Sequence, residues 1–114
     1  MAVFNGAFPI LPGKEDAARA FAAACGDERK SEFDDLQRRA STSRETWTLQ
    51  QTPMGAFMLV WFESDALEEA FADLATAQDE FTVWFRGQIL DCTGVDMSVP
   101  DDSPPPEVVL EWTK

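Results

Sequence analysis

The chain has 114 residues, 45% of them hydrophobic and 26% charged, which is the size and composition of one globular domain over residues 1–114. Its net charge of −12 argues against nucleic-acid binding and membrane attachment, because such a surface repels phosphate groups and anionic lipids. No apolar run approaches the roughly 18 residues of a membrane span, and no basic leader precedes one, so we expect a cytoplasmic protein. Cys25 and Cys92 lack metal-ligand spacing and are expected to be buried thiols.

The first third of the chain predicts one strand and two helices. Residues 3–10 read as a strand, which is ended by Pro9 and by the Pro12-Gly13 pair. Residues 14–25 are rich in alanine and carry an apolar stripe at helical spacing. Residues 28–39 are more polar and are expected to form a surface helix or a flap.

Residues 44–63 predict a β-hairpin, around which the other elements are arranged. Two β-rich runs flank Thr52-Pro53-Met54-Gly55, where proline and glycine suit a three-residue loop closed by a glycine bulge. If Thr52 pairs with Ala56, Trp47 lies opposite Trp61 on one face of the sheet. The other face then carries Met58, Val60 and Phe62, which are too apolar to stay exposed.

The remaining sequence predicts helices at about residues 65–74 and 80–92 and a short strand at 95–99. Residues 100–106 are a proline-rich, acidic connector, and residues 107–113 read as a final strand. The predicted fold class is therefore α+β, with the ferredoxin-like βαββαβ order and extra helical segments. Such a sheet has one bare face, and a second copy packed sheet to sheet would cover it.

This order resembles the dimeric α/β-barrel superfamily, which includes antibiotic-biosynthesis monooxygenases, and in particular its small bacterial members. The resemblance rests on Pro12-Gly13-Lys14 before the first helix, on the Thr52–Gly55 turn and on the last strand. It implies a homodimer through the face with Met58, Val60 and Phe62, and a cavity between each sheet and its helices. It does not imply a reaction, because one fold hosts many activities.

The residue types that are missing restrict the chemistry. The sequence contains no histidine and no tyrosine, so a haem held by a proximal histidine and a zinc site with histidine are excluded. There is also no glycine-rich phosphate-binding motif. We therefore expect no cofactor and no metal.

Carboxylates, tryptophans and one arginine remain as candidate site residues. In the predicted register Glu45 and Glu63 face each other and form a candidate acid–base pair. The alternative is that both lie at the wet end of the sheet beside Arg44 or Arg86. The candidate ligand-binding residues are Trp47, Trp61, Trp84 and Arg86, although aromatic stripes of this kind also occur in solid cores.

Three functions stay open at this point. The first is binding of a small apolar or aromatic molecule in a helix–sheet cavity. The second is a cofactor-independent monooxygenase or isomerase that uses the same cavity, and the third is a non-catalytic dimer or protein-interaction module. The sequence does not decide whether the protein is an enzyme.

Overall fold

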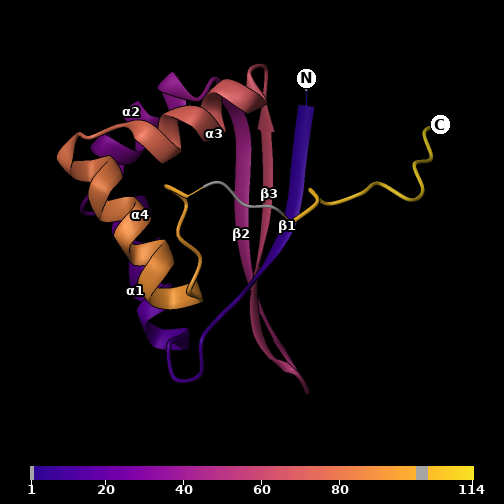
Figure 1. Ribbon diagram of the computed structural model, residues 1–114, viewed down its shortest axis with the longest axis horizontal. Helices are drawn as coiled ribbons and strands as arrows, with labels where there is room; N and C mark the ends of the chain where they lie inside the picture. Colours follow the sequence, from indigo (N-terminus) through magenta and orange to yellow (C-terminus); the bar gives the residue numbers. More distant parts are fainter. Residues whose placement is uncertain (1, 100–102) are drawn as a thin grey trace.

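The computed structural model describes residues 2–99 and 103–114, and it confirms the α+β class. A three-stranded antiparallel sheet in the order β1-β3-β2 has the helices on one of its faces (Figure 1). In chain order the elements are β1 (Ala2–Pro9), α1 (Glu15–Gly26), α2 (Lys30–Arg39), β2 (Thr42–Thr52), β3 (Gly55–Ser64), α3 (Leu67–Thr76) and α4 (Glu80–Thr93). Within residues 2–99 and 103–114, no helix has the length and apolar character needed to cross a bilayer.

The predicted βαββαβ order is wrong, because the strands expected at 95–99 and 107–113 are not formed. Residues 103–114 have no regular secondary structure and extend away from the body past β1 (Figure 1). The predicted connector falls partly here, and its residues 100–102 lie outside the described residues. A strand pattern gives a strand only where a neighbouring backbone edge accepts its hydrogen bonds, and the described tail has no such neighbour.

The hairpin is present, but its predicted register is wrong by one residue. Thr52 pairs with Gly55, which leaves a two-residue loop of Pro53 and Met54 in place of a bulged three-residue loop. The Thr52 hydroxyl accepts a hydrogen bond from the Met54 amide at 3.1 Å and donates one to the Gly55 carbonyl at 2.8 Å. Because strand side chains alternate with a period of two, this shift moves every β3 residue to the other face relative to β2.

The shift decides what each sheet face carries. Trp47 pairs with Val60 rather than with Trp61, and Leu49 pairs with Met58. The predicted exposure of Met58, Val60 and Phe62 on the bare face is therefore wrong, because all three pack toward the helices. The face without helices, which we call the open face, carries Phe57, Leu59 and Trp61 in the centre of the sheet.

The helices bury an apolar core against the sheet. Phe21 on α1, Leu36 on α2 and Phe85 on α4 form one buried cluster, with Trp47 of β2 packed against it. The alanine-rich stripe of α1 allows this close packing, since Ala18 is buried beside Ile10 and Ala56. α4 is fixed at its start by Asp79, whose carboxylate accepts from the Thr82 amide at 3.1 Å, and it ends at a left-handed glycine, Gly94.

Ser64 joins three elements at the end of β3. Its buried hydroxyl donates to the Ala40 carbonyl after α2 at 2.6 Å and accepts from the Ala66 amide before α3 at 2.9 Å. This arrangement satisfies two backbone groups near helix ends that would otherwise lack partners. It also fixes α2 and α3 relative to the sheet, and both helices line the site described next.

Candidate functional site

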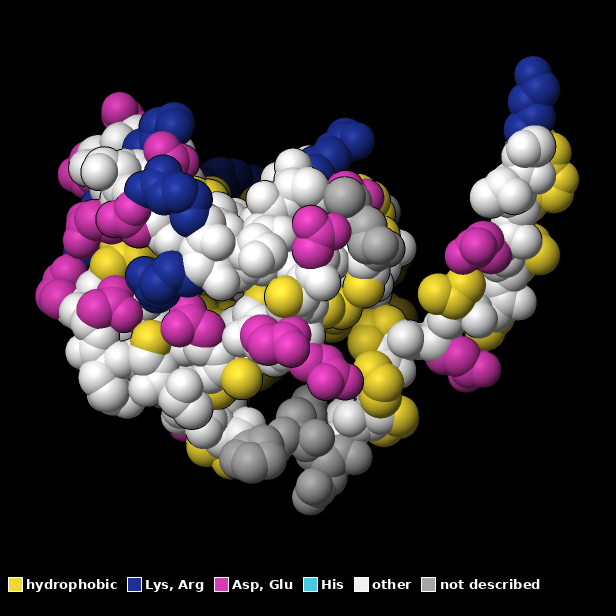
Figure 2. Space-filling model, turned by 90° about the horizontal axis from the view of Figure 1, so that it is seen from above, with side chains coloured by type: hydrophobic (Ala, Val, Ile, Leu, Met, Phe, Trp, Pro, Cys, Tyr) yellow, Lys and Arg dark blue, Asp and Glu magenta, His cyan; other side chains and the backbone are white. Residues whose placement is uncertain are grey.

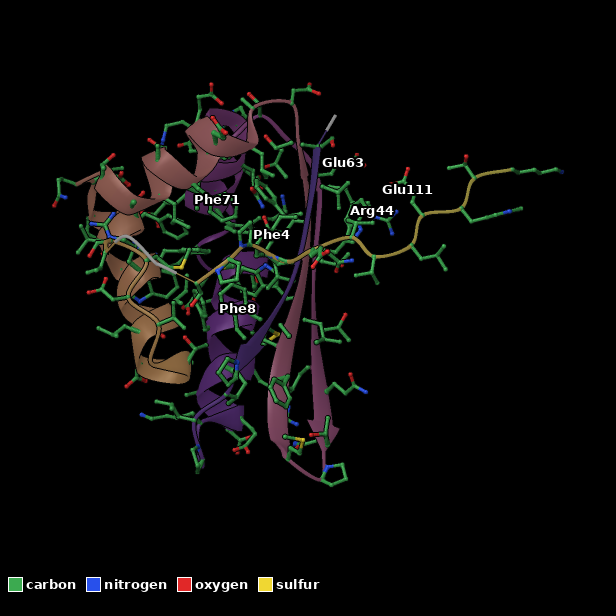
Figure 3. The ribbon with its side chains drawn as sticks, turned by 45° about the vertical axis from the view of Figure 1, so that its right-hand side comes forward. Phe4, Phe8, Arg44, Glu63, Phe71 and Glu111 are labelled. Carbon is green, nitrogen blue, oxygen red and sulfur yellow. The ribbon has the colours of Figure 1, made fainter. Side chains whose placement is uncertain are left out.

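A cavity of about 120 Å³ lies between the helices and the sheet. Every helix and every strand contributes to its lining, which is almost entirely apolar. Phe4 and Phe8 of β1 and Phe71 of α3 lie along one side of it, and Figure 3 shows these three labelled side chains between the sheet and the helices.

Trp47 anchors an aromatic wall at the other side of the cavity. Its ring centroid lies 5.1 Å from that of Phe21, 5.8 Å from Phe85 and 5.9 Å from Phe33. These tilted and edge-on arrangements are the favoured geometries for aromatic pairs. The wall therefore combines one strand and three helices into a rigid surface for an apolar ligand.

Glu45 is the only carboxyl group that the described part of the chain contributes to the lining. It accepts hydrogen bonds from the indole Nε1 of Trp47 at 2.5 Å and from the amide Nε2 of Gln37 at 2.8 Å. The Gln37 Oε1 atom in turn accepts from the Thr42 hydroxyl at 2.7 Å, which fixes the orientation of that amide. The carboxyl group is thus held in one position at the edge of an apolar space.

Burial raises the pKa of Glu45 above its ordinary value, and the hydrogen bonds from Trp47 and Gln37 oppose this rise. A carboxyl group with a raised pKa exchanges a proton closer to neutral pH than an exposed one does. Glu45 can therefore bind a polar atom of a ligand in either state, as a donor when protonated and as an acceptor when ionised.

Burial disfavours the thiolate form of both cysteines. Burial, followed by the charge of Glu45, raises the pKa of Cys25 to about 12. Burial also raises the pKa of Cys92, which lines the cavity from α4. Both thiols are buried, as predicted, and the thiolate form that reacts with electrophiles is scarce.

The structure separates the predicted carboxylate pair. Glu45 lies opposite Phe62, whereas Glu63 pairs with Arg44 in the sheet and accepts from the Ser43 hydroxyl at 2.7 Å. The expected pairing of Glu45 with Glu63 is wrong because the register differs by one residue, and the two carboxyl groups point to opposite faces. Figure 3 shows Glu63 and Arg44 away from the phenylalanines of the cavity.

Of the three tryptophans predicted to bind a ligand, one lines the cavity and two do not. Trp47 lines the cavity, but Trp61 lies on the open face with the Arg44 guanidinium 5.3 Å from its ring centre. Trp84 is outside the lining and packs against Phe21, with the Arg29 guanidinium 4.4 Å from its ring. The sequence therefore identified one tryptophan of the cavity, and the register error misplaced a second.

Arg86 also lies outside the cavity lining. Its guanidinium Nη1 donates to the carbonyl oxygens of Leu74 at 2.8 Å and Ala77 at 2.7 Å. These carbonyl groups lie near the C-terminal end of α3, where helical hydrogen bonds run out. The side chain therefore stabilises the connection between α3 and α4.

Sequence reasoning missed Gln37, which orients Glu45. A signal was available in α2, where Phe33, Leu36, Gln37 and Ala40 share one helical face. A polar residue on an otherwise apolar helix face often has a buried polar partner. Phe4 and Phe8 were also missed, although their alternation on β1 placed them on a common face.

Within the described ranges, no group of acidic or cysteine side chains is arranged to hold a metal ion. Comparison with protein-family models, with curated proteins and with solved structures finds no match to this chain. What is established is a small α+β domain with a three-stranded antiparallel sheet, four helices and an apolar cavity that contains one oriented carboxyl group.

Proposed function

We propose that this protein binds a small apolar or aromatic molecule in the cavity between the sheet and the helices. The observation that carries the proposal is the combination of an apolar lining with one oriented carboxyl group, that of Glu45. Ligand sites in proteins commonly pair an apolar wall with a few placed polar groups that fix orientation.

The size of the cavity restricts the ligand. Its volume of about 120 Å³ is close to that of engineered apolar cavities of roughly 150 Å³ that bind benzene. A single aromatic ring with one hydroxyl or amino substituent fits this description. The ring would pack among Trp47, Phe21 and Phe85, and its polar substituent would form a hydrogen bond with Glu45.

A cofactor-independent oxidation, with molecular oxygen as the oxidant, or an isomerisation is the second candidate, and the position of Glu45 favours it. In such chemistry a carboxylate removes a proton from an acidic carbon or hydroxyl of the substrate, and the apolar surroundings exclude water. The raised pKa makes Glu45 a stronger base when it is ionised. The resemblance to antibiotic-biosynthesis monooxygenases supports this candidate. Because Glu63 lies on the other face of the sheet, Glu45 is the only carboxyl base among the described residues of the cavity lining.

A homodimer is part of the proposal. The open face carries Phe57, Leu59 and Trp61, which are only partly buried within one chain, and a second copy would cover them. The third candidate, a dimer or interaction module without a ligand, uses this surface alone.

Titration with phenol and with toluene tests the binding proposal, and binding is monitored by tryptophan fluorescence and by isothermal titration calorimetry. We expect saturable binding of one molecule per chain. Ala70→Met should abolish it by filling the cavity, because Ala70 is buried in the lining. Ala20→Met, at an exposed position of α1, is the matched control and should bind normally.

The outcomes separate the three candidates. Equal and saturable binding by wild type and the Ala70→Met variant would contradict the cavity as the site. Absence of binding at millimolar concentration in the wild type would leave the interaction module as the remaining function. Turnover of a phenolic substrate that is lost in Glu45→Gln, with binding retained, would select the enzyme.

A further inference from the structure

The C-terminal segment has the pattern of a strand but no strand partner. Its apolar residues Val108, Leu110 and Trp112 alternate with Glu107, Val109, Glu111 and Thr113. This period of two is typical of a strand with one buried side. Yet Val108, Val109, Leu110 and Trp112 are 75%, 86%, 84% and 80% exposed. Figures 1 and 2 both show the segment clear of the body.

β1 is an edge strand of the sheet, where a further strand could pair. In the order β1-β3-β2, β1 pairs with β3 only, so its outer edge has backbone groups without a strand partner among the described residues. Such an edge accepts an additional strand readily. The seven residues 107–113 and the eight of β1 have nearly the same extended length, about 23 and 26 Å.

The cavity lining is partly exposed on the same side. Its lining residues Phe4 and Phe8 on β1 and Phe71 on α3 are only partly buried. Elsewhere in the lining, Phe21 of α1 and Leu36 of α2 are buried, and Trp47 is partly buried. A fourth strand beside β1 would place one row of side chains next to Phe4 and Phe8, and so would cover the exposed part of the cavity.

We propose that residues 107–113 of one chain form this fourth strand on the β1 edge of a second copy, in a reciprocal dimer. Val108, Leu110 and Trp112 then face the partner's cavity, and Glu107 and Glu111 lie on the side of the open face. A second copy is the occupant because the tail leads away from its own sheet (Figure 1), and its twelve described residues reach about 40 Å when extended. Reciprocal exchange about a two-fold axis closes the assembly at two chains. The proposal does not depend on a bound ligand.

The first test compares two tail variants of the full chain by sedimentation velocity at several concentrations. Leu110→Asp places a charge on the apolar side of the proposed strand, and we expect it to weaken the dimer at least tenfold. Thr113→Asp adds the same charge on the other side of the same segment and should change the dissociation constant less than twofold. Because both residues are exposed in one chain, circular dichroism should show the same folded domain for both variants.

The second test distinguishes exchange from closure within one chain. Single cysteines replace Val3, Asn5 or Ala7 on β1 of one chain and Val109 on the tail of another, and the chains are mixed under mild oxidation. Exchange predicts a disulfide-linked species with one chain of each kind, and neither chain alone should form it. Doubly substituted chains that form only an internal disulfide would overturn the proposal in favour of closure within a single chain. A wild type that is monomeric at 100 µM, or a Leu110→Asp dimer as tight as the wild type, would also overturn it.

Discussion

Glu45 and Trp47, two residues apart on β2, face the same cavity, and the indole Nε1 donates to the carboxyl group at 2.5 Å. Strand alternation places both side chains on the helix side, where Gln37 adds a second hydrogen bond to the carboxyl group. An ionisable group is therefore kept at a fixed position in an apolar wall. The proposed ligand site depends on this carboxyl group, and so does the pH dependence of stability.

Glu45→Gln should stabilise the fold at neutral pH relative to the wild type. Burial raises the folded-state pKa of Glu45 above its unfolded value near 4.3, so the native state retains this proton at a pH where the unfolded chain has lost it. Wild-type stability from this group is therefore fully present below the unfolded pKa and is lost as pH rises through the folded pKa. Glutamine carries no buried charge, but it has one acceptor oxygen where glutamate has two, so the lost hydrogen bond from Trp47 or Gln37 offsets part of this gain.

Urea unfolding of both proteins between pH 3.5 and 8 measures this difference. We expect the advantage of Glu45→Gln to grow with pH and then to level off. Glu63→Gln is the matched control for net charge, because it removes one carboxyl group from the opposite face of the sheet. The effect of Glu63→Gln is subtracted from that of Glu45→Gln. If Glu45→Gln is still less stable than the wild type at pH 7, the ionised Glu45 stabilises the fold through its hydrogen bonds more than its burial destabilises it, contrary to this prediction.

Leu59 and Val60 test the observed register, because neighbouring residues on β3 face opposite sides. Val60→Asp puts a charge against the helices and should destabilise the domain by several kcal/mol. Leu59→Asp puts the same charge on the open face and should cost less than about 1 kcal/mol in one chain, while it weakens a dimer that uses this face. Thermal unfolding measured by circular dichroism distinguishes them, and the reverse ranking would support the register predicted from the sequence.

Arg86→Ala should destabilise the protein through the connection between α3 and α4. The substitution removes hydrogen bonds to the carbonyl groups of Leu74 and Ala77, and we expect a loss of about 1–3 kcal/mol in the free energy of unfolding. Arg19→Ala is the control, since Arg19 forms only an exposed ion pair with Asp16 on α1 and should contribute less than about 1 kcal/mol.

The affinity of the Arg86→Ala variant for phenol tests whether Arg86 also contributes to the ligand site. If Arg86 stabilises the fold only, Arg86→Ala should bind phenol with the affinity of the wild type under conditions where it is folded. A large loss of affinity without a loss of stability would assign Arg86 to the ligand site, as the sequence had suggested.

Local sequence signals predicted the elements of this fold well, and long-range pairing less well. The alanine-rich stripe of α1 and the Pro53-containing turn gave the first helix and the hairpin. The register failed because Gly55 suits a bulged loop as well as the end of a two-residue loop, and both faces of β3 are apolar. Where both faces accept apolar residues, the alternation pattern cannot select one register.

The candidate site shows the same division. Glu45 was predicted from a pairing with Glu63 that is not formed, and Trp47 from the aromatic residues of the hairpin, yet the structure places both at the cavity. Trp61 and Glu63 depended on the register and lie on the other face. The fourth strand was predicted from the pattern of residues 107–113, but whether such a segment pairs depends on an edge elsewhere, which local sequence does not contain.

A crystal structure under xenon pressure shows whether small apolar molecules enter the cavity between the sheet and the helices. Xenon occupies dry apolar cavities of this size because dispersion contacts with the lining stabilise it. We expect xenon density among Trp47, Phe21 and Phe85, and none there in the Ala70→Met variant. A wild-type cavity without xenon, or xenon only on the open face near Trp61, would contradict the proposed binding site.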